Sequence, residues 1–338
     1  MTVLVTGANG HVGFVLTKHL VERGYKVRAS VRDAGDPART ARLQALGVEI
    51  VEADLLKPDT LARAAEGMEA VFQVAATYEM IPKKGAASVI RDSVEGGINM
   101  LRAAKAAGVK RVVFTSSCVA IGPGPRGAPP RDERQWNEQL AVPYFRAKTE
   151  AERRAWAYAK ESGLDLVAIL PGAVSGPGFA RNTPTIDVVE NIRKGMFRMG
   201  VIRADLPFVD VRDVAEAHRL ALETPSASGR YVAMSDAAVD FRQLAEAVRA
   251  IDPKTPKVGP TMPDFMLGLM PAFDRIGHLL MGTARTITPE MVGTMKGRSW
   301  NISNARAKQE LGWSPRISLQ QSLKDTLEAL GANRRAAA

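Results

Sequence analysis

The sequence is poor in cysteine and histidine, and this scarcity excludes several kinds of chemistry. Among 338 residues Cys118 is the single cysteine, and there are four histidines. One cysteine cannot form an intramolecular disulfide, which fits a reducing compartment, so we expect a cytoplasmic location. The histidines are scattered along the chain, so we predict no metal centre.

Long apolar runs are also missing. The apolar start of the chain ends at Val5, has no basic residues before it, and is too short for a secretory signal. A membrane-spanning helix needs about 20 consecutive apolar residues. The most apolar segment, residues 265–281, is interrupted by Pro271, Asp274 and Arg275. We therefore expect no membrane span.

Acidic residues are fewer than basic ones. The chain has 36 Asp and Glu residues and 46 Lys and Arg residues, which gives a net charge of +10. Such an excess is compatible with a nucleic-acid or anionic membrane partner. The basic residues, however, are scattered and form no block interleaved with aromatic residues. We favour a basic surface that helps to bind an anionic cofactor, and expect no nucleic-acid partner.

Short β-branched runs alternate with helical patterns through the first half of the chain. This alternation predicts an α/β fold of the Rossmann type, a doubly wound parallel sheet with helices on both faces. The Gly- and Pro-rich segment 122–130 is predicted to contain no regular element. Strands are predicted at 3–5, 27–31, 48–51, 70–74, 111–115 and 166–170, and helices at 12–23, 39–46, 60–65, 89–107 and 148–162.

After Pro171 the sequence becomes irregular and rich in proline, which predicts a smaller C-terminal substrate-binding part. We expect residues 1–170 to form a Rossmann domain, with residues 205–235 returning to it. Residues 171–204 and 236–330 would mainly bind substrate, and residues 331–338 would form a frayed tail. The methionine-rich segment 262–281 fits either a substrate lid or ordinary packing, since methionine serves both.

Three glycines lie between the first strand and the first helix, in residues 6–13, which read TGANGHVG. Gly7, Gly10 and Gly13 allow a tight turn, close approach of a pyrophosphate, and packing of helix on strand. The backbone N–H groups and the dipole at the helix start favour an anion. Because the loop has this strand–helix context, we predict dinucleotide binding and disfavour a connector without a ligand.

The end of the second strand selects between cofactors. An acidic residue there binds the adenosine ribose hydroxyls of NAD, whereas an arginine accommodates the 2′-phosphate of NADP. Asp33 lies at about the expected distance, but Arg32 is the first residue past the strand, and guanidinium pairs with phosphate in a bidentate manner. We predict NADP(H), with NAD less favoured. The alternative is a solvated Arg32–Asp33 pair without a role.

Tyr144 and Lys148 share one face of a predicted helix, because they are four residues apart. A tyrosine phenol has a pKa of about 10 in water, and a neighbouring ammonium favours the phenolate. Ser117, at the end of the fifth strand, would face the ligand crevice and hydrogen-bond a substrate oxygen. The adjacent Cys118 would point to the opposite side by strand alternation, as a buried structural residue.

Together these residues resemble the extended short-chain dehydrogenase/reductase family along nearly the whole chain. Within that family the chain looks most like the dihydroflavonol reductase branch, because residues 27–33, VRASVRD, are similar to its NADP-selecting strand. One departure is Ser93, where the family usually has Asn. The features that carry the resemblance are residues 6–13, 54–55, 75–76, 115–117, 144–148, 170–174, 208–215 (FVDVRDVA) and 311–315 (LGWSP).

The resemblance implies roles for individual residues. Ser117, Tyr144 and Lys148 would be the catalytic triad, with Lys148 also binding the nicotinamide ribose. A homodimer through helices of the first half is a further family expectation. The cofactor would be bound by Gly7, Asn9, Gly10, His11, Val12 and Gly13 in the glycine loop, by Arg32, by Asp54 and Leu55 at the adenine, by Ala75 and Ala76, and by Pro171, Ala173 and Val174 at the nicotinamide.

Three functions compete at this point. The first is reduction of a ketone or aldehyde by NADPH, or the reverse oxidation of an alcohol, with Tyr144 as general acid or base. The second is a nucleotide-sugar epimerase or dehydratase, whose diphosphate would be held by Arg193, Arg198, Arg203 or Arg298. The third is a non-enzymatic NADP sensor, which does not need the triad. The sequence favours the reductase, acting on a fairly apolar small molecule.

Overall fold

A computed structural model of the protein describes residues 1–75, 85–281 and 288–337. Its centre is a seven-stranded sheet in the order β11-β7-β5-β4-β1-β2-β3, in which every neighbouring pair is parallel. The strands are β1 (Thr2–Val5), β2 (Lys26–Val31), β3 (Glu49–Glu52), β4 (Ala70–Gln73), β5 (Arg111–Thr115), β7 (Leu166–Pro171) and β11 (Gly229–Ala233).

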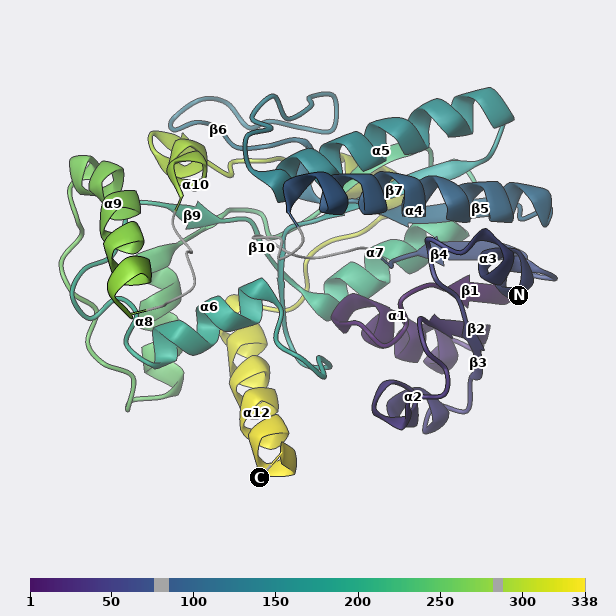
Figure 1. The fold of residues 1–338 in the computed structure, drawn as a ribbon, viewed down its shortest axis with the longest axis horizontal. Coiled ribbons are helices and arrows are strands. Elements are labelled where there is room, and N and C mark those ends of the chain that lie inside the picture. The colour runs from purple at the N-terminus through teal and green to yellow at the C-terminus, as the bar shows by residue number, and fades with distance from the viewer. Residues whose placement is uncertain (76–84, 282–287, 338) are drawn as a thin grey trace.

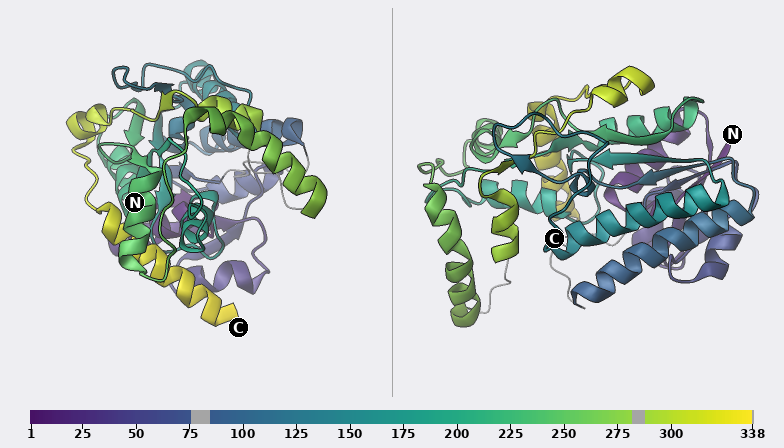
Figure 2. Two further views of the ribbon diagram at one scale, coloured as in Figure 1. Left: turned by 90° about the vertical axis from the view of Figure 1, so that its left-hand side faces the viewer. Right: turned by 90° about the horizontal axis from the view of Figure 1, so that it is seen from above.

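Helices cover both faces of the sheet, because successive strand side chains point to opposite sides. Val3 and Val5 pack against helices on one face, whereas Leu4 between them packs on the other. The first face carries α1 (His11–Glu22), α2 (Pro37–Gln44), α7 (Val211–Glu223) and α11 (Ala305–Leu311). The second face carries α3 (Pro58–Ala65), α4 (Ala86–Ala106) and α5 (Pro143–Ser162), of which α4 and α5 lie side by side in Figures 1 and 2. The predicted fold class is confirmed.

A smaller part lies beyond the carboxyl ends of the strands, to the left in Figure 1. It has its own core, in which Phe197 and Phe241 pack edge to face. Its strand pairs are β8 (Ala173–Ser175) with β10 (Phe208–Asp210), and β9 (Asp205–Leu206) with β12 (Val239–Asp240). Its helices are α6 (Pro184–Arg193), α8 (Phe241–Ile251), α9 (Asp264–Met281), α10 (Pro289–Met295) and α12 (Leu319–Ala337). The domain boundaries given above stay a prediction.

Two local predictions are wrong. The helix predicted from residue 148 begins at Pro143, whose ring sets the backbone angle that the first helical turn requires. The segment 122–130 does contain a strand, β6 (Gly124–Pro125), which pairs with β13 (Arg298–Ser299). Its partner is so distant in sequence that local composition does not reveal the pairing.

The methionine-rich segment forms α9, which packs through one side only. Leu267 is buried, whereas Phe265 is 67% exposed, Phe273 66% and Leu279 71%. Ordinary packing therefore accounts for only part of the apolar residues of α9. In the parts of the chain that the structure describes, no helix has the length and apolarity needed to cross a bilayer.

Replacing Gly172 by Ala is expected to destabilise the fold, because a Cβ at this position would lie 1.8 Å from the carbonyl oxygen of Pro207. Relieving such a clash by backbone shifts costs about 1–3 kcal/mol. The matched control is Gly268→Ala in α9, where an added Cβ meets no atom within 4 Å. This control should be neutral or slightly stabilising. Urea unfolding of both variants measures the difference, and equal stabilities would contradict the prediction.

Candidate active site

The predicted site residues gather at one edge of the sheet, where the parallel strands end. The chain order reverses at β1, which lies between β4 and β2, and such a reversal opens a crevice for ligands. The loops at this edge are tied together. The Thr6 hydroxyl accepts hydrogen bonds from the backbone N–H groups of Val74 and Ala75, each at 3.0 Å.

The glycine loop brings the start of α1 close to β1. A Cβ at Gly13 would lie 2.2 Å from the Gly7 carbonyl oxygen, so only glycine allows this approach. Gly7 itself has φ of 62°, and a Cβ there would lie 2.9 Å from the Ala75 Cα. Gly10 immediately precedes α1. The loop therefore directs the first N–H groups of α1 toward the crevice, as a pyrophosphate requires.

The His11 side chain packs against the segment that follows β8. Its Nε2 lies 3.1 Å from the Pro177 carbonyl oxygen, and its ring meets Phe179 edge to face. Burial lowers the pKa of His11 to about 4, so the imidazole is neutral at physiological pH. Asn9 and Val12 are half-buried beside it.

Arg32 is exposed, and within the residues described its side chain makes no hydrogen bond or ion pair. Asp33 is engaged elsewhere, since its carboxylate accepts the Gly35 N–H at 3.1 Å. Two further arginines of this region are also engaged. Arg39 pairs with Asp36, and Arg42 lies over the Phe14 ring at 3.7 Å. Arg32 is thus the guanidinium left available at the end of β2.

The predicted adenine contacts lie after β3, next to α4. Asp54 accepts the Leu56 N–H at 3.0 Å, and the Leu55 carbonyl accepts a hydrogen bond from Asn99 at 3.0 Å. A Cβ at Gly96 would lie 2.8 Å from that of Leu55, so α4 is packed closely on this turn. Ala75 follows β4 at the same edge, whereas Ala76 lies outside the described residues.

The nicotinamide end is predicted where β7 ends at Pro171. The chain passes through Gly172 into β8, and the Ala173 N–H donates to the Pro207 carbonyl at 2.5 Å. Val174 follows in the same strand and is half-buried. This crossover joins the main sheet to the smaller part.

Ser117 does not continue strand β5, which ends at Thr115. It instead caps the short helix η1 (Cys118–Ala120), and its hydroxyl accepts the Val119 N–H at 3.3 Å. The alternation argument for Cys118 was therefore wrong, although the side chain is buried. Burial raises the pKa of the Cys118 thiol to about 12, so it is not a nucleophile at neutral pH.

Tyr144 and Lys148 occupy the first two turns of α5, which packs against η1. Tyr144 is 7% exposed and belongs to the same buried cluster as Val119 of η1. The structure therefore brings the tyrosine close to the turn that Ser117 and η1 form, here called the serine turn. Burial lowers the pKa of the half-buried Lys148 ammonium to about 8, against the opposing effect of the Glu152 charge. The three predicted catalytic residues thus come from two elements in contact.

A polar network that was not predicted from the sequence lies behind this pair. The Ser116 hydroxyl donates to Glu152 at 2.6 Å, and Arg230 donates to the same carboxylate at 2.7 Å. The position of Glu152, four residues after Lys148, was the available signal. Its partner Arg230 lies 78 residues further along the chain, on β11, and no local pattern connects the two.

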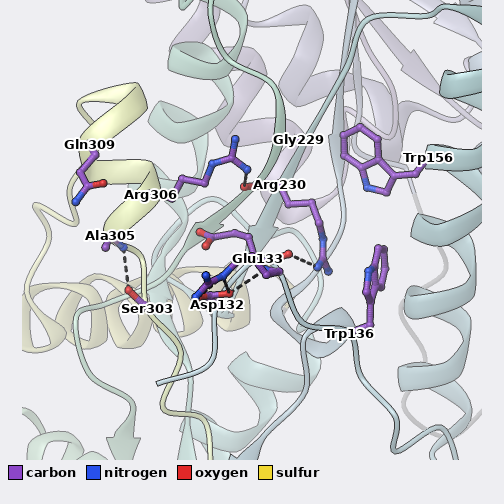
Figure 3. A pocket seen from close by; sticks show the side chains of 11 residues that line it. Asp132, Glu133, Trp136, Trp156, Gly229, Arg230, Ser303, Ala305, Arg306 and Gln309 are labelled. Carbon is purple, nitrogen blue, oxygen red and sulfur yellow. Dashed lines mark hydrogen bonds and ion pairs between the residues drawn. The ribbon is translucent and has the colours of Figure 1, made fainter. Parts of the chain in front are cut away.

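A cleft of about 650 Å³ opens beside the first residues of β11, away from the carboxyl ends of the strands (Figure 3). Trp136 and Trp156 stand on one side of it, with Arg230 beside Trp136, and Arg306 lies on another. None of the predicted catalytic or cofactor residues lines this cleft. Among the described residues, no group of His, Cys, Asp and Glu side chains is placed to hold a metal ion.

Comparison with known proteins places these features in a family. Dihydroflavonol 4-reductase of Zea mays is 36% identical over 69% of this chain and 70% of its own length. Cinnamoyl-CoA reductase 1 of Arabidopsis thaliana is 35% identical over 75% of this chain and 76% of its own.

The fold is shared more widely. The crystal structure of yeast methylglyoxal/isovaleraldehyde reductase Gre2, complexed with NADPH, matches 99% of this chain and 100% of its own with a TM-score of 0.78, at 20% identity. The family model for the NAD dependent epimerase/dehydratase family matches residues 3–234. The chain therefore belongs to the NAD dependent epimerase/dehydratase family.

Proposed function

We propose that the protein is an NADPH-dependent reductase of a ketone or aldehyde. The observation that carries this proposal is the placement of Ser117, Tyr144 and Lys148 on two contacting elements at the carboxyl edge of the sheet. The glycine loop lies at the same edge. The likeness to dihydroflavonol 4-reductase and cinnamoyl-CoA reductase supports a carbonyl as the reacting group.

The structure fits a phosphorylated dinucleotide at this edge. The close packing of Gly7 and Gly13 leaves the first N–H groups of α1 directed toward the crevice. Arg32 supplies an exposed guanidinium without a partner in the described chain, suited to a 2′-phosphate. Lys148 would hold the ribose hydroxyls next to the nicotinamide.

The bound cofactor supplies the hydride. The Ser117 hydroxyl donates a hydrogen bond to the substrate carbonyl oxygen and orients the carbonyl group. Tyr144 donates its proton to that oxygen, and the Lys148 ammonium stabilises the phenolate left behind. Both charged groups act in a largely buried place, where their interaction is stronger than in water.

The epimerase and sensor alternatives receive less support. Of the arginines considered for a sugar diphosphate, Arg193 pairs with Asp252 at 3.7 Å, and Arg298 lies in strand β13. A non-enzymatic NADP sensor would not require a lysine with a lowered pKa one helical turn from a buried tyrosine. The two relatives described above are both reductases by name.

Tyr144→Phe is expected to lower kcat for carbonyl reduction by about 10²–10⁴, the usual contribution of a general acid. Its affinity for NADPH should stay unchanged, because the phenol does not hold the cofactor. The assay follows NADPH absorbance with a panel of ketones, aldehydes and a nucleotide-sugar. Tyr158→Phe on the same helix is the control. No NADPH oxidation by the wild type, with a cofactor that copurifies, would favour the epimerase.

Arg32→Ala is expected to weaken NADPH binding by about 10- to 100-fold, the value of charge-assisted hydrogen bonds to a phosphate. NADH lacks this phosphate, so its affinity should change little. Arg39→Ala, which removes an arginine already paired with Asp36, serves as the control. Fluorescence titration with both cofactors measures the effect. An equal loss for NADH and NADPH would contradict the assigned role.

The reduction rate is expected to fall as the pH rises through about 8, where Lys148 loses its proton. Lys148 is protonated well below this pH and neutral well above it. The neutral amine does not stabilise the Tyr144 phenolate. The profile of kcat/KM against pH tests this, because it reports groups of the free enzyme. In Lys148→Arg, whose guanidinium stays charged, the decrease in kcat/KM near pH 8 should be absent. A decrease that persists in this variant would be due to another group.

A further inference from the structure

A buried ion pair lies behind the catalytic helix. Glu152 is fully buried, and Arg230 is nearly so. Taking two charges out of water is costly, and the attraction between them compensates only when the hydrogen bonds are well made. Neither residue is needed to bind the cofactor or the substrate in the proposed function, so the pair requires another explanation.

All hydrogen-bonding positions of the Glu152 carboxylate are directed at identifiable donors. One oxygen accepts the Ser116 hydroxyl at 2.6 Å, and the other accepts Arg230 Nε at 2.7 Å and Trp156 Nε1 at 3.2 Å. Arg230 Nη2 adds a longer contact at 3.3 Å. The carboxylate is therefore held from three sides, namely by Ser116 just after β5, by Arg230 of β11 and by Trp156 of its own helix α5.

These contacts join the two elements that carry the catalytic residues. Ser116 immediately precedes Ser117, and Glu152 lies one helical turn after Lys148 on the same face of α5. The hydrogen bond between Ser116 and Glu152 therefore sets the position of the serine turn relative to the tyrosine and the lysine. A displacement of about 1 Å in such a geometry is enough to slow a reaction by about 100-fold.

Arg230 is itself fixed, so it cannot leave the carboxylate. Its Nη1 donates to the carbonyl oxygens of Glu133 at 2.7 Å and Gln135 at 2.8 Å, and its guanidinium lies over the Trp136 ring at 3.9 Å. Figure 3 shows this side of Arg230 at the cleft. Every donor group of the guanidinium is thus engaged by the protein.

We propose that Glu152 is a positioning residue for the reductase reaction: its carboxylate, fixed by Arg230 and Ser116, places Ser117 relative to α5 and holds a negative charge one helical turn from Lys148. The proposal rests on the proposed function for its catalytic meaning. The charges near Lys148 agree with it. Of the charged side chains described, Glu152 opposes the effect of burial on the pKa of Lys148, and Arg230 approaches the carboxylate from β11.

Glu152→Gln tests the charge with little change of shape. Competitive acetylation of the full-length protein by limiting acetic anhydride, with mass spectrometry of the Lys148 peptide, gives the titration midpoint of Lys148 without any turnover. We expect a midpoint near pH 8 in the wild type, lowered by roughly one pH unit in Glu152→Gln. Asp213→Asn, a buried carboxylate that accepts backbone N–H groups elsewhere, should leave the midpoint unchanged.

If the role of Glu152 were structural only, Glu152→Gln and Asp213→Asn would both reduce stability, and the titration midpoint of Lys148 would stay unchanged. That result would overturn the proposal. Where Glu152→Gln does not fold, Glu152→Asp moves the carboxylate away and should lower the midpoint by less. An unchanged midpoint in that folded variant also overturns it. Wild-type protein that titrates as expected but reduces no carbonyl would refute the proposed function and not the effect of Glu152 on Lys148.

The positional part of the proposal is tested by Ser116→Ala, which removes a neutral hydrogen bond. We expect kcat to fall by roughly 10-fold or more, with KM for NADPH and the Lys148 midpoint unchanged. Thr149→Ser, a conservative change at another buried hydroxyl of α5, is the control, since it keeps the hydrogen bond to the Phe145 carbonyl. A Ser116→Ala enzyme with the full kcat of the wild type would show that this hydrogen bond does not position the site.

Discussion

The reversal of chain order at β1 is the constraint on which the rest of the structure depends. Because β1 lies between β2 and β4, the loops that follow these strands diverge and leave a crevice above the sheet. The packing of α1 on β1 through Gly7 and Gly13 allows the helix start to face that crevice. The proposed pyrophosphate contacts lie on the glycine loop and the first residues of α1, whose position follows from this arrangement.

Burial gives the site its electrostatic character. Lys148 lies where its charged form is disfavoured, so the pKa of its ammonium falls toward the physiological range. A buried lysine without any counter-charge would lose its proton still more readily. Glu152 opposes this effect from one turn away, and Arg230 in turn compensates the charge of Glu152. Lys148 and Glu152 of α5 and Arg230 of β11 therefore form a chain of charges in which each one limits the cost of burying the next.

Much of the fold was predictable from sequence, because it follows from local patterns. The period of apolar residues gave the strands and helices of the parallel sheet, and the glycine spacing gave the loop after β1. Two features could not be predicted from local patterns. The β6–β13 pairing and the Glu152–Arg230 pair join segments far apart in the chain. The early start of α5 depends on Pro143 at its first position, and the turn at Ser117 depends on the end of β5. Ala76 lies outside the described residues, and the other cofactor contacts stay predictions.

The same sheet serves proteins that share little sequence with this chain, as the match at 20% identity shows. Such a fold depends on which positions are apolar, and many sequences satisfy that pattern equally well. The chemistry that we propose depends instead on a few side chains at one edge, namely Arg32, Ser117, Tyr144 and Lys148. Of these residues Arg32 is exposed, whereas Tyr144 and Ser117 are buried. Glu152 is buried completely and yet acts, as we propose, on the chemistry. Such residues join the stability of the fold to its activity, and at these positions a change is expected to affect both.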